Sequence, residues 1–168
     1  MTSAELRALQ LPLKTRYRED PETARVTSTA EASLPAGAIQ ADVRAGGAVV
    51  EVGLHPATGG DGSKRCSADL LLEALVGCAG VTLQAVATAM GLTVRGGRIR
   101  AEGDWDARGT LGVSRDTPVG LTDVRLSFDI DSDATPEQSA KLMELVERYC
   151  VVAQTLKAGT RIRLLDGR

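Results

Sequence analysis

Residues 67–78, SADLLLEALVGC, begin the segment that decides the fold. The segment continues to about Met90, and Leu, Val and Ala would occupy nearly every side of the helix that it forms. Ser67 suits the helix N-cap, Asp69 places an acid where the helix dipole favours one, and Gly91 suits the position after the last turn. The sequence therefore predicts a long, central and largely enclosed helix.

Alternating apolar and polar residues predict strands before this helix. Such runs occupy residues 26–34, 39–45 and 48–54, and the turn signals Pro35-Ala36-Gly37 and Gly46-Gly47 separate them. Strands that follow one another without a helical crossover form an antiparallel meander in which each strand has one solvated face.

The second half of the chain predicts further strands and helices. Residues 92–105 and 124–130 have strand patterns, and Thr135-Pro136-Glu137-Gln138 is a capping box that opens a helix. Another helical turn or two is expected over 151–157, and a last short strand over 161–164. This order predicts an α+β fold rather than α/β, with helices packed on one face of the sheet.

A length of 168 residues fits one domain with a substantial core. We expect residues 24–168 to form that domain and residues 1–23 to be an N-terminal extension or arm. The N-terminus lacks the pattern of a secretory signal, and Glu73 and Gln84 interrupt the apolar tract of the long helix, which favours a buried helix over a membrane span. A helix that is apolar on all sides needs cover on both sides, and two copies packed together would supply it, so we expect a homodimer.

Composition excludes several kinds of partner. The 20 basic and 22 acidic residues give a net charge of −2, and no block of like charge dominates, so neither a nucleic acid nor a membrane partner is expected. Aromatic residues make up only 2%, too few for the stacking platform of a single-strand binder. Three cysteines, an odd number, favour a reducing, cytoplasmic compartment over a disulfide framework.

The cysteines are the candidates for chemistry. Cys78 lies mid-helix between Gly77 and Gly80, and each such glycine costs about 1 kcal/mol, which indicates close approach by another helix or a small ligand. Cys78 could equally be a small apolar filler. Cys150 follows the second helix, and Cys66 lies beside two basic residues that could lower its pKa.

Other chemistries have weaker support. A zinc site from the three cysteines and His55 would lack any CxxC pair and would need a mid-helix ligand. His55 is the only histidine, and no triad of nucleophile, histidine and acid is recognisable around it.

Taken together, these motifs resemble those of the OsmC/Ohr family of organic hydroperoxide reductases. Residues 67–78 are similar to the family's helix, which begins with an acidic residue and reaches a cysteine. Glu147-Arg148-Tyr149-Cys150 is similar to the second cysteine motif, which follows a helix some 70 residues later. The order of strands also agrees, and the resemblance spans roughly residues 24–165.

The resemblance implies a fold, a mechanism and partners. The fold would be an intertwined homodimer in which antiparallel sheets wrap around central helices and each active site lies at the subunit interface. Cys78 would attack an organic hydroperoxide and become a sulfenic acid. Cys150 would resolve it as a disulfide that a dithiol, such as a lipoyl group, reduces. Such a peroxidase needs no metal or organic cofactor.

The resemblance also implies an arginine, held by a carboxylate, beside the reactive thiolate. Asp69 stands at the acidic position of the helix start, and Arg16, Arg44 and Arg65 are candidates for the arginine, although none matches a motif. Cys150 is followed by Val151 rather than by the proline common at that point.

Two other functions stay open at this point. The same dimer could hold a small apolar ligand with inert thiols, or it could be a redox sensor whose disulfide changes a partner's binding. The sequence also leaves open what Cys66 does and whether the loop at 107–119 lines a pocket.

Overall fold

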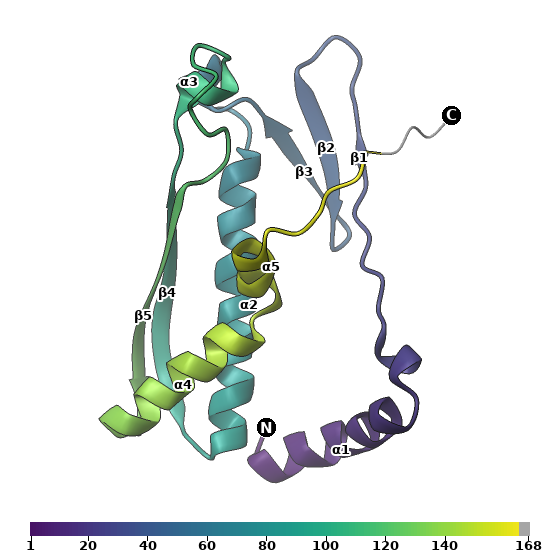
Figure 1. Cartoon of the computed structure of the whole chain (residues 1–168), viewed down its shortest axis with the longest axis vertical. Helices are drawn as coiled ribbons and strands as arrows, with labels where there is room; N and C mark the ends of the chain where they lie inside the picture. Colours follow the sequence, from purple (N-terminus) through teal and green to yellow (C-terminus); the bar gives the residue numbers. More distant parts are fainter. Residues whose placement is uncertain (165–168) are drawn as a thin grey trace. The chain divides into compact units, whose positions relative to one another are not determined.

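The computed structural model describes residues 1–164 (Figure 1). Helices and strands follow one another in the order α1 (Ser3–Glu19), η1 (Pro21–Ala24), β1 (Ala32–Ser33), β2 (Gln40–Ala45), β3 (Ala48–Gly53), η2 (Pro56–Thr58), α2 (Ser67–Met90), β4 (Val94–Asp104), α3 (Ala107–Thr110), β5 (Asp123–Ser132), α4 (Pro136–Tyr149) and α5 (Val151–Ala158). The strands form two antiparallel groups, β1-β2-β3 and β4-β5.

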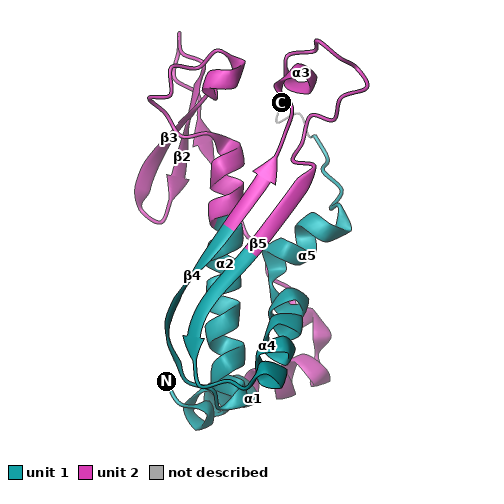
Figure 2. Ribbon diagram, turned by 90° about the vertical axis from the view of Figure 1, so that its left-hand side faces the viewer, with its two compact units in different colours: residues 1–11, 74–100, 127–168 teal, residues 12–73, 101–126 magenta. Residues whose placement is uncertain are grey.

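The chain divides into two units (Figure 2). Unit 1 contains residues 1–11, 74–100 and 127–168, and unit 2 contains residues 12–73 and 101–126. The helix α2 and the strands β4 and β5 each run from one unit into the other.

Unit 2 holds the three-stranded sheet. The strands β2 and β3 pair from Gln40 with Gly53 to Ala45 with Ala48, as the alternation of their residues predicts. The predicted strand over 26–34 is wrong for most of its length, because only Ala32 and Ser33 pair with β2. Val26 and Leu34 are 84% and 80% exposed, so alternation alone did not make this run a strand.

The helix α2 ends at Met90 as predicted, and Gly91 follows it at a φ of 74°. It begins one residue earlier than predicted, because Ser67 is its first helical residue rather than its N-cap. It is less enclosed than predicted. Its buried side chains are spaced four residues apart and form one stripe: Leu75, Ala79, Leu83 and Ala87. Val81 is 73% exposed. By length and composition alone α2 could cross a membrane, a property that it shares with core helices of soluble proteins.

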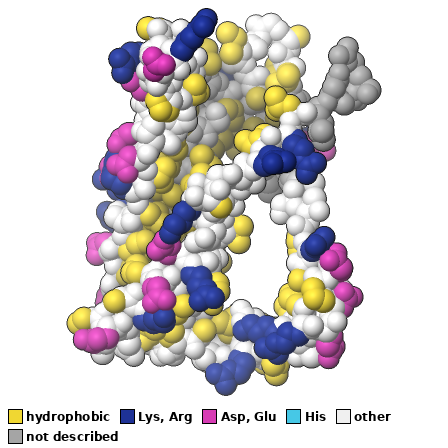
Figure 3. Space-filling model, viewed as in Figure 1, with side chains coloured by type: hydrophobic (Ala, Val, Ile, Leu, Met, Phe, Trp, Pro, Cys, Tyr) yellow, Lys and Arg dark blue, Asp and Glu magenta, His cyan; other side chains and the backbone are white. Residues whose placement is uncertain are grey.

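The buried apolar side chains of residues 1–164 all belong to unit 1. They are the stripe of α2 together with Leu142 and Val146 of α4 and Cys150 after it. Unit 2 exposes large apolar side chains instead, among them Ile39 and Val49. Figure 3 shows hydrophobic side chains open to solvent among the charged ones.

The strands β4 and β5 form a ribbon with one half-buried face. Within unit 1, Ile99, Phe128 and Ile130 alternate with exposed residues such as Arg95, which pairs with Asp131 at 2.5 Å. Gly97 has a φ of 150°, and a Cβ there would meet the carbonyl oxygen of Asp129 at 2.4 Å, so only glycine fits this close approach.

Three parts of the chain differ from the predictions. Residues 3–19 form α1, although Pro12 lies inside it and a proline disfavours a helix interior. The loop at 107–119 contains the short helix α3, whose N-cap is Asp106. The strand expected over 161–164 is wrong, because these residues pair with no strand among residues 1–164.

The predicted capping box of α4 is confirmed. The Thr135 hydroxyl accepts from the backbone N–H of Gln138, and the Gln138 side chain accepts from the backbone N–H of Thr135. Pro136 occupies the first helical position, where its missing N–H costs nothing.

Replacing the capping hydroxyl should destabilise unit 1. We expect Thr135→Ala to lower the free energy of unfolding by about 1 kcal/mol, because an N–H of the first turn loses its acceptor. Thr135→Ser keeps the hydroxyl and should unfold near the wild-type midpoint. Urea unfolding followed by circular dichroism measures both, and equal midpoints for the two variants would contradict the assignment.

Candidate active site

Cys78 and Cys150 are brought together within unit 1, although they are 72 positions apart in the sequence. Cys78 lies in the middle of α2 and is half-buried, whereas Cys150 is 1% exposed. Both are free thiols, and their side chains are hydrogen-bonded to each other. Of the predicted site residues, these two therefore form a pair.

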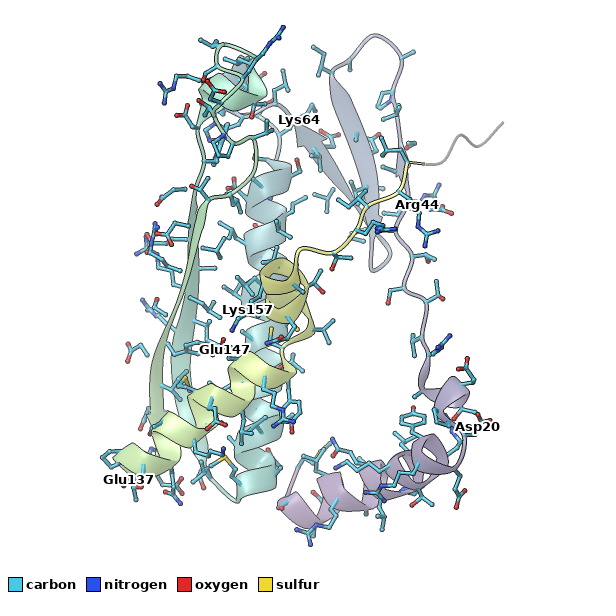
Figure 4. The ribbon with its side chains drawn as sticks, in the orientation of Figure 1. Asp20, Arg44, Lys64, Glu137, Glu147 and Lys157 are labelled. Carbon is cyan, nitrogen blue, oxygen red and sulfur yellow. The ribbon has the colours of Figure 1, made fainter. Side chains whose placement is uncertain are left out.

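The corner between α4 and α5 positions Cys150. Cys150 has φ −72° and ψ 106°, which is extended backbone, so one residue ends α4 and also precedes α5. Two contacts bind the helices together at this corner. The side-chain amide of Gln154 donates to the carbonyl of Glu147 at 2.7 Å, and Lys157 pairs with the Glu147 carboxylate at 2.6 Å (Figure 4).

The surroundings shift the pKa values of the two thiols in opposite directions. Burial raises the pKa of Cys78, but hydrogen bonds from the Val152 N–H, the Cys150 thiol, the Val151 N–H and the Thr82 hydroxyl outweigh it, so its pKa lies below the ordinary value. Burial raises the pKa of Cys150, and the contact with Cys78 raises it further, against a lowering by the Ala153 N–H.

This arrangement pairs a nucleophile with a proton donor. The thiolate forms first on Cys78, and Cys150 keeps its proton and donates it in the hydrogen bond between the sulfurs. A thiolate with a second thiol in contact can be oxidised to a sulfenic acid and then captured as a disulfide.

Sequence reasoning missed three of these donors. Thr82 follows Cys78 by four residues on α2, and this spacing places both on one helix face. That spacing was the signal that could have found Thr82. The N–H groups of Val151 and Val152 belong to the first turn of α5, where backbone donors have no partner inside the helix. Finding them required the three-dimensional position of the corner.

The predicted acid and arginines lie in unit 2. Asp69 is exposed in the first turn of α2. Arg65 forms an ion pair with Glu73, and Arg16 lies over the ring of Tyr17 at 5.2 Å. Arg44 is on β2 (Figure 4). The thiol pair, in contrast, belongs to unit 1.

Cys66 belongs to unit 2, where it lines a pocket with a volume of about 400 Å³. His55 and Trp105 line the same pocket and pack edge to face, with ring centroids 5.2 Å apart. Thr110 and Val119 also line it, so the loop at 107–119 contributes to this pocket.

An apolar groove of about 540 Å³ runs along α2 in unit 1. Gly77 and Gly80, which flank Cys78 in the sequence, line it together with Val81 and with Ile99 of β4. A Cβ on Gly80 would meet Ile99 at an ordinary 3.6 Å, and one on Gly77 would meet nothing within 4 Å. The contacts described in one chain therefore do not require either glycine.

No group of three or more His, Cys, Asp and Glu residues within residues 1–164 is placed to hold a metal ion.

Comparison with known proteins gives a family and a fold. The family model described as OsmC-like protein matches residues 60–164. No curated protein matches the chain. An OsmC-like protein from Mycoplasma pneumoniae has a TM-score of 0.66 at 17% identity, over 79% of this chain and 88% of that one.

Two further solved structures have the same fold. An OsmC-like protein of unknown function from Vibrio cholerae has a TM-score of 0.61 at 15% identity, over 78% of this chain and 94% of that one. A hypothetical protein from Aquifex aeolicus has a TM-score of 0.58 at 14% identity, over 82% and 92%. These likenesses confirm the predicted α+β class with antiparallel sheets.

The opposite pKa shifts of the two thiols can be measured by alkylation at different pH values. We expect Cys78 to react with iodoacetamide with a titration midpoint below that of Cys150, because only the Cys78 thiolate receives several hydrogen bonds. Peptide mapping after brief alkylation between about pH 5 and pH 10 measures how fast each cysteine reacts at each pH. The pH at which that rate is half of its value at high pH is the titration midpoint of the cysteine. A lower midpoint for Cys150 would reverse the assigned roles.

Proposed function

The chain belongs to the OsmC-like protein family, and from that premise we propose that it is a thiol-dependent peroxidase that reduces organic hydroperoxides through Cys78 and Cys150. The observation that carries the proposal is the hydrogen bond between the two thiols, with the pKa lowered on Cys78 and raised on Cys150. Such a division of roles suits a nucleophile and a resolving thiol.

The reaction proceeds in two steps on this pair. The Cys78 thiolate attacks the terminal oxygen of the hydroperoxide, a sulfur–oxygen bond forms, and the oxygen–oxygen bond breaks. The leaving alkoxide takes up a proton and departs as the alcohol. Cys150 then loses its proton and attacks the sulfur of Cys78, and the disulfide forms as the hydroxyl leaves as water. A dithiol, of which a lipoyl group is one example, returns both thiols by exchange.

We propose that the subunit interface supplies an apolar pocket at Cys78, which would favour an organic substrate over hydrogen peroxide. Burial of an alkyl chain contributes about 0.8 kcal/mol per methylene, a gain that hydrogen peroxide cannot obtain. The groove along α2 is not that pocket, because Gly77, Gly80 and Val81 line it and Cys78 does not.

A homodimer is part of the proposal. Unit 2 contributes no buried apolar side chain among residues 1–164, and α2 leaves Val81 exposed. A second copy would cover this surface and would supply a contact for the glycines of α2. At that interface we propose that Asp69 orients one of Arg16, Arg44 and Arg65. Three free cysteines suit the reducing conditions of the cytoplasm.

One equivalent of cumene hydroperoxide tests the reaction directly. We expect the reduced protein to lose two thiols and to yield a peptide that links Cys78 to Cys150, by thiol count, intact mass and peptide mapping. Cys78→Ser should abolish peroxide consumption. Cys66→Ser is the matched control and should leave the loss of two thiols unchanged, because Cys66 lies outside the pair.

The outcomes separate the functions that the sequence left open. Three thiols that survive the peroxide would contradict the proposal and would favour a dimer that holds an apolar ligand. A disulfide that forms but supports no turnover with dihydrolipoamide would indicate a redox sensor.

The dimer is tested by light scattering after gel filtration. We expect a mass of about twice the 17.6 kDa of one chain. Val81→Glu should reduce it to that of one chain, because a buried carboxylate without a partner costs several kcal/mol. Ala140→Glu, at an exposed position of α4, should leave the mass unchanged. A dimeric Val81→Glu variant would place the interface elsewhere.

A further inference from the structure

The chain turns from α4 into α5 at a single residue, Cys150. Its backbone is extended, with φ −72° and ψ 106°, between Tyr149 at the end of α4 and Val151 at the start of α5. Cys150 is 1% exposed, whereas Tyr149 and Val151 are 56% and 71% exposed. The position of this one buried side chain therefore depends on the angle at which the two helices meet.

The side chain of Gln154 spans this corner. Its backbone N–H donates to the Cys150 carbonyl at 2.9 Å, and its side-chain amide donates to the Glu147 carbonyl at 2.7 Å. Glu147 is among the last four residues of α4, whose carbonyls lack an N–H partner within the helix. One residue of α5 is thus bonded both to the last turn of α4 and to the residue that joins the helices.

An ion pair crosses the same corner. Lys157 pairs with the Glu147 carboxylate at 2.6 Å (Figure 4), and the two side chains are 68% and 61% exposed. Water screens an exposed ion pair, and two long side chains lose rotamer freedom in forming it, so such pairs contribute little. The amide of Gln154 instead supplies a donor to a backbone acceptor that α4 leaves open.

We propose that Gln154 is a positioning residue that fixes the corner between α4 and α5 and thereby holds Cys150 where it can resolve Cys78. The inference deepens the proposed function and rests on it in taking Cys78 as the partner of Cys150. Loss of the side-chain amide would widen the range of angles between α4 and α5, and with it the range of Cys150 positions. Fewer of those positions allow a disulfide to form, so the effective concentration of one thiol at the other would fall.

Equilibration with glutathione measures this effective concentration without any peroxide. The two protein thiols are oxidised to a disulfide as one glutathione disulfide is reduced to two glutathione thiols. Every full-length sample carries Cys66→Ser, so that Cys78 and Cys150 are the cysteines that react. Acid quenching and mass spectrometry then give the oxidised fraction at each glutathione ratio.

We expect Gln154→Ala to lower the effective concentration roughly fivefold, as the loss of one neutral hydrogen bond would give. Gln154→Glu has the same length but no N–H donor, and it should fall at least as far. Lys157→Ala is the matched control, because it removes the exposed ion pair at the same corner, and it should change the value by less than about twofold.

Three results would overturn the role of Gln154. One is a wild-type effective concentration in Gln154→Ala or in Gln154→Glu. Another is a loss in Lys157→Ala as large as that in Gln154→Ala, which would assign the corner to the ion pair. The third is a lower urea midpoint for Gln154→Ala with an unchanged effective concentration, which would make the hydrogen bond merely structural. Circular dichroism establishes that each variant is folded.

Failure of the proposed function gives a different result. A wild-type protein that loses no thiols to cumene hydroperoxide, with a lowered effective concentration in Gln154→Ala, would remove the peroxidase and keep the role of Gln154. A protein that reduces peroxide, with Gln154→Ala equilibrating like wild type, would do the reverse. A wild-type protein that forms no Cys78–Cys150 disulfide at any glutathione ratio would overturn both.

Discussion

The hydrogen bond between the Cys78 and Cys150 sulfurs constrains much of unit 1. It requires the middle of α2 to meet the junction of α4 and α5, and the buried stripes of α2 and α4 hold these elements in unit 1. Each sulfur is partly withdrawn from water, which opposes ionisation of both. The donors gather around Cys78, so the cost of burial is offset on one sulfur and left in place on the other.

The sequence predicted the parts that depend on local signals. The capping box at Thr135, the glycine after α2 and the pairing of β2 with β3 follow from short patterns, and the structure confirms them. The strand over 26–34 failed, because alternation indicates a strand only where a neighbour supplies the other half of the ladder. The helix α1 was not predicted, and it contains Pro12, a residue that disfavours a helix interior.

The site was predictable only in part, for a physical reason. Resemblance selected the two cysteines, and the structure joins them within unit 1. Backbone amides at the start of α5 contribute to the pKa shifts of the two thiols. A sequence motif records side chains and therefore cannot indicate a backbone amide. The carboxylate and arginine sought from the family pattern lie in unit 2, whose apolar residues remain exposed in the single chain.

The amide donors of α5 give the site a form of mutational robustness. A side-chain donor disappears with one base change, but the N–H of Val151 persists through every substitution except proline, which alone lacks it. Proline would also suit that first helical position and leave the helix intact. A chain with the proline that is common at this position of the family would keep the helix and lack this donor, so the Val151 N–H is dispensable for the fold.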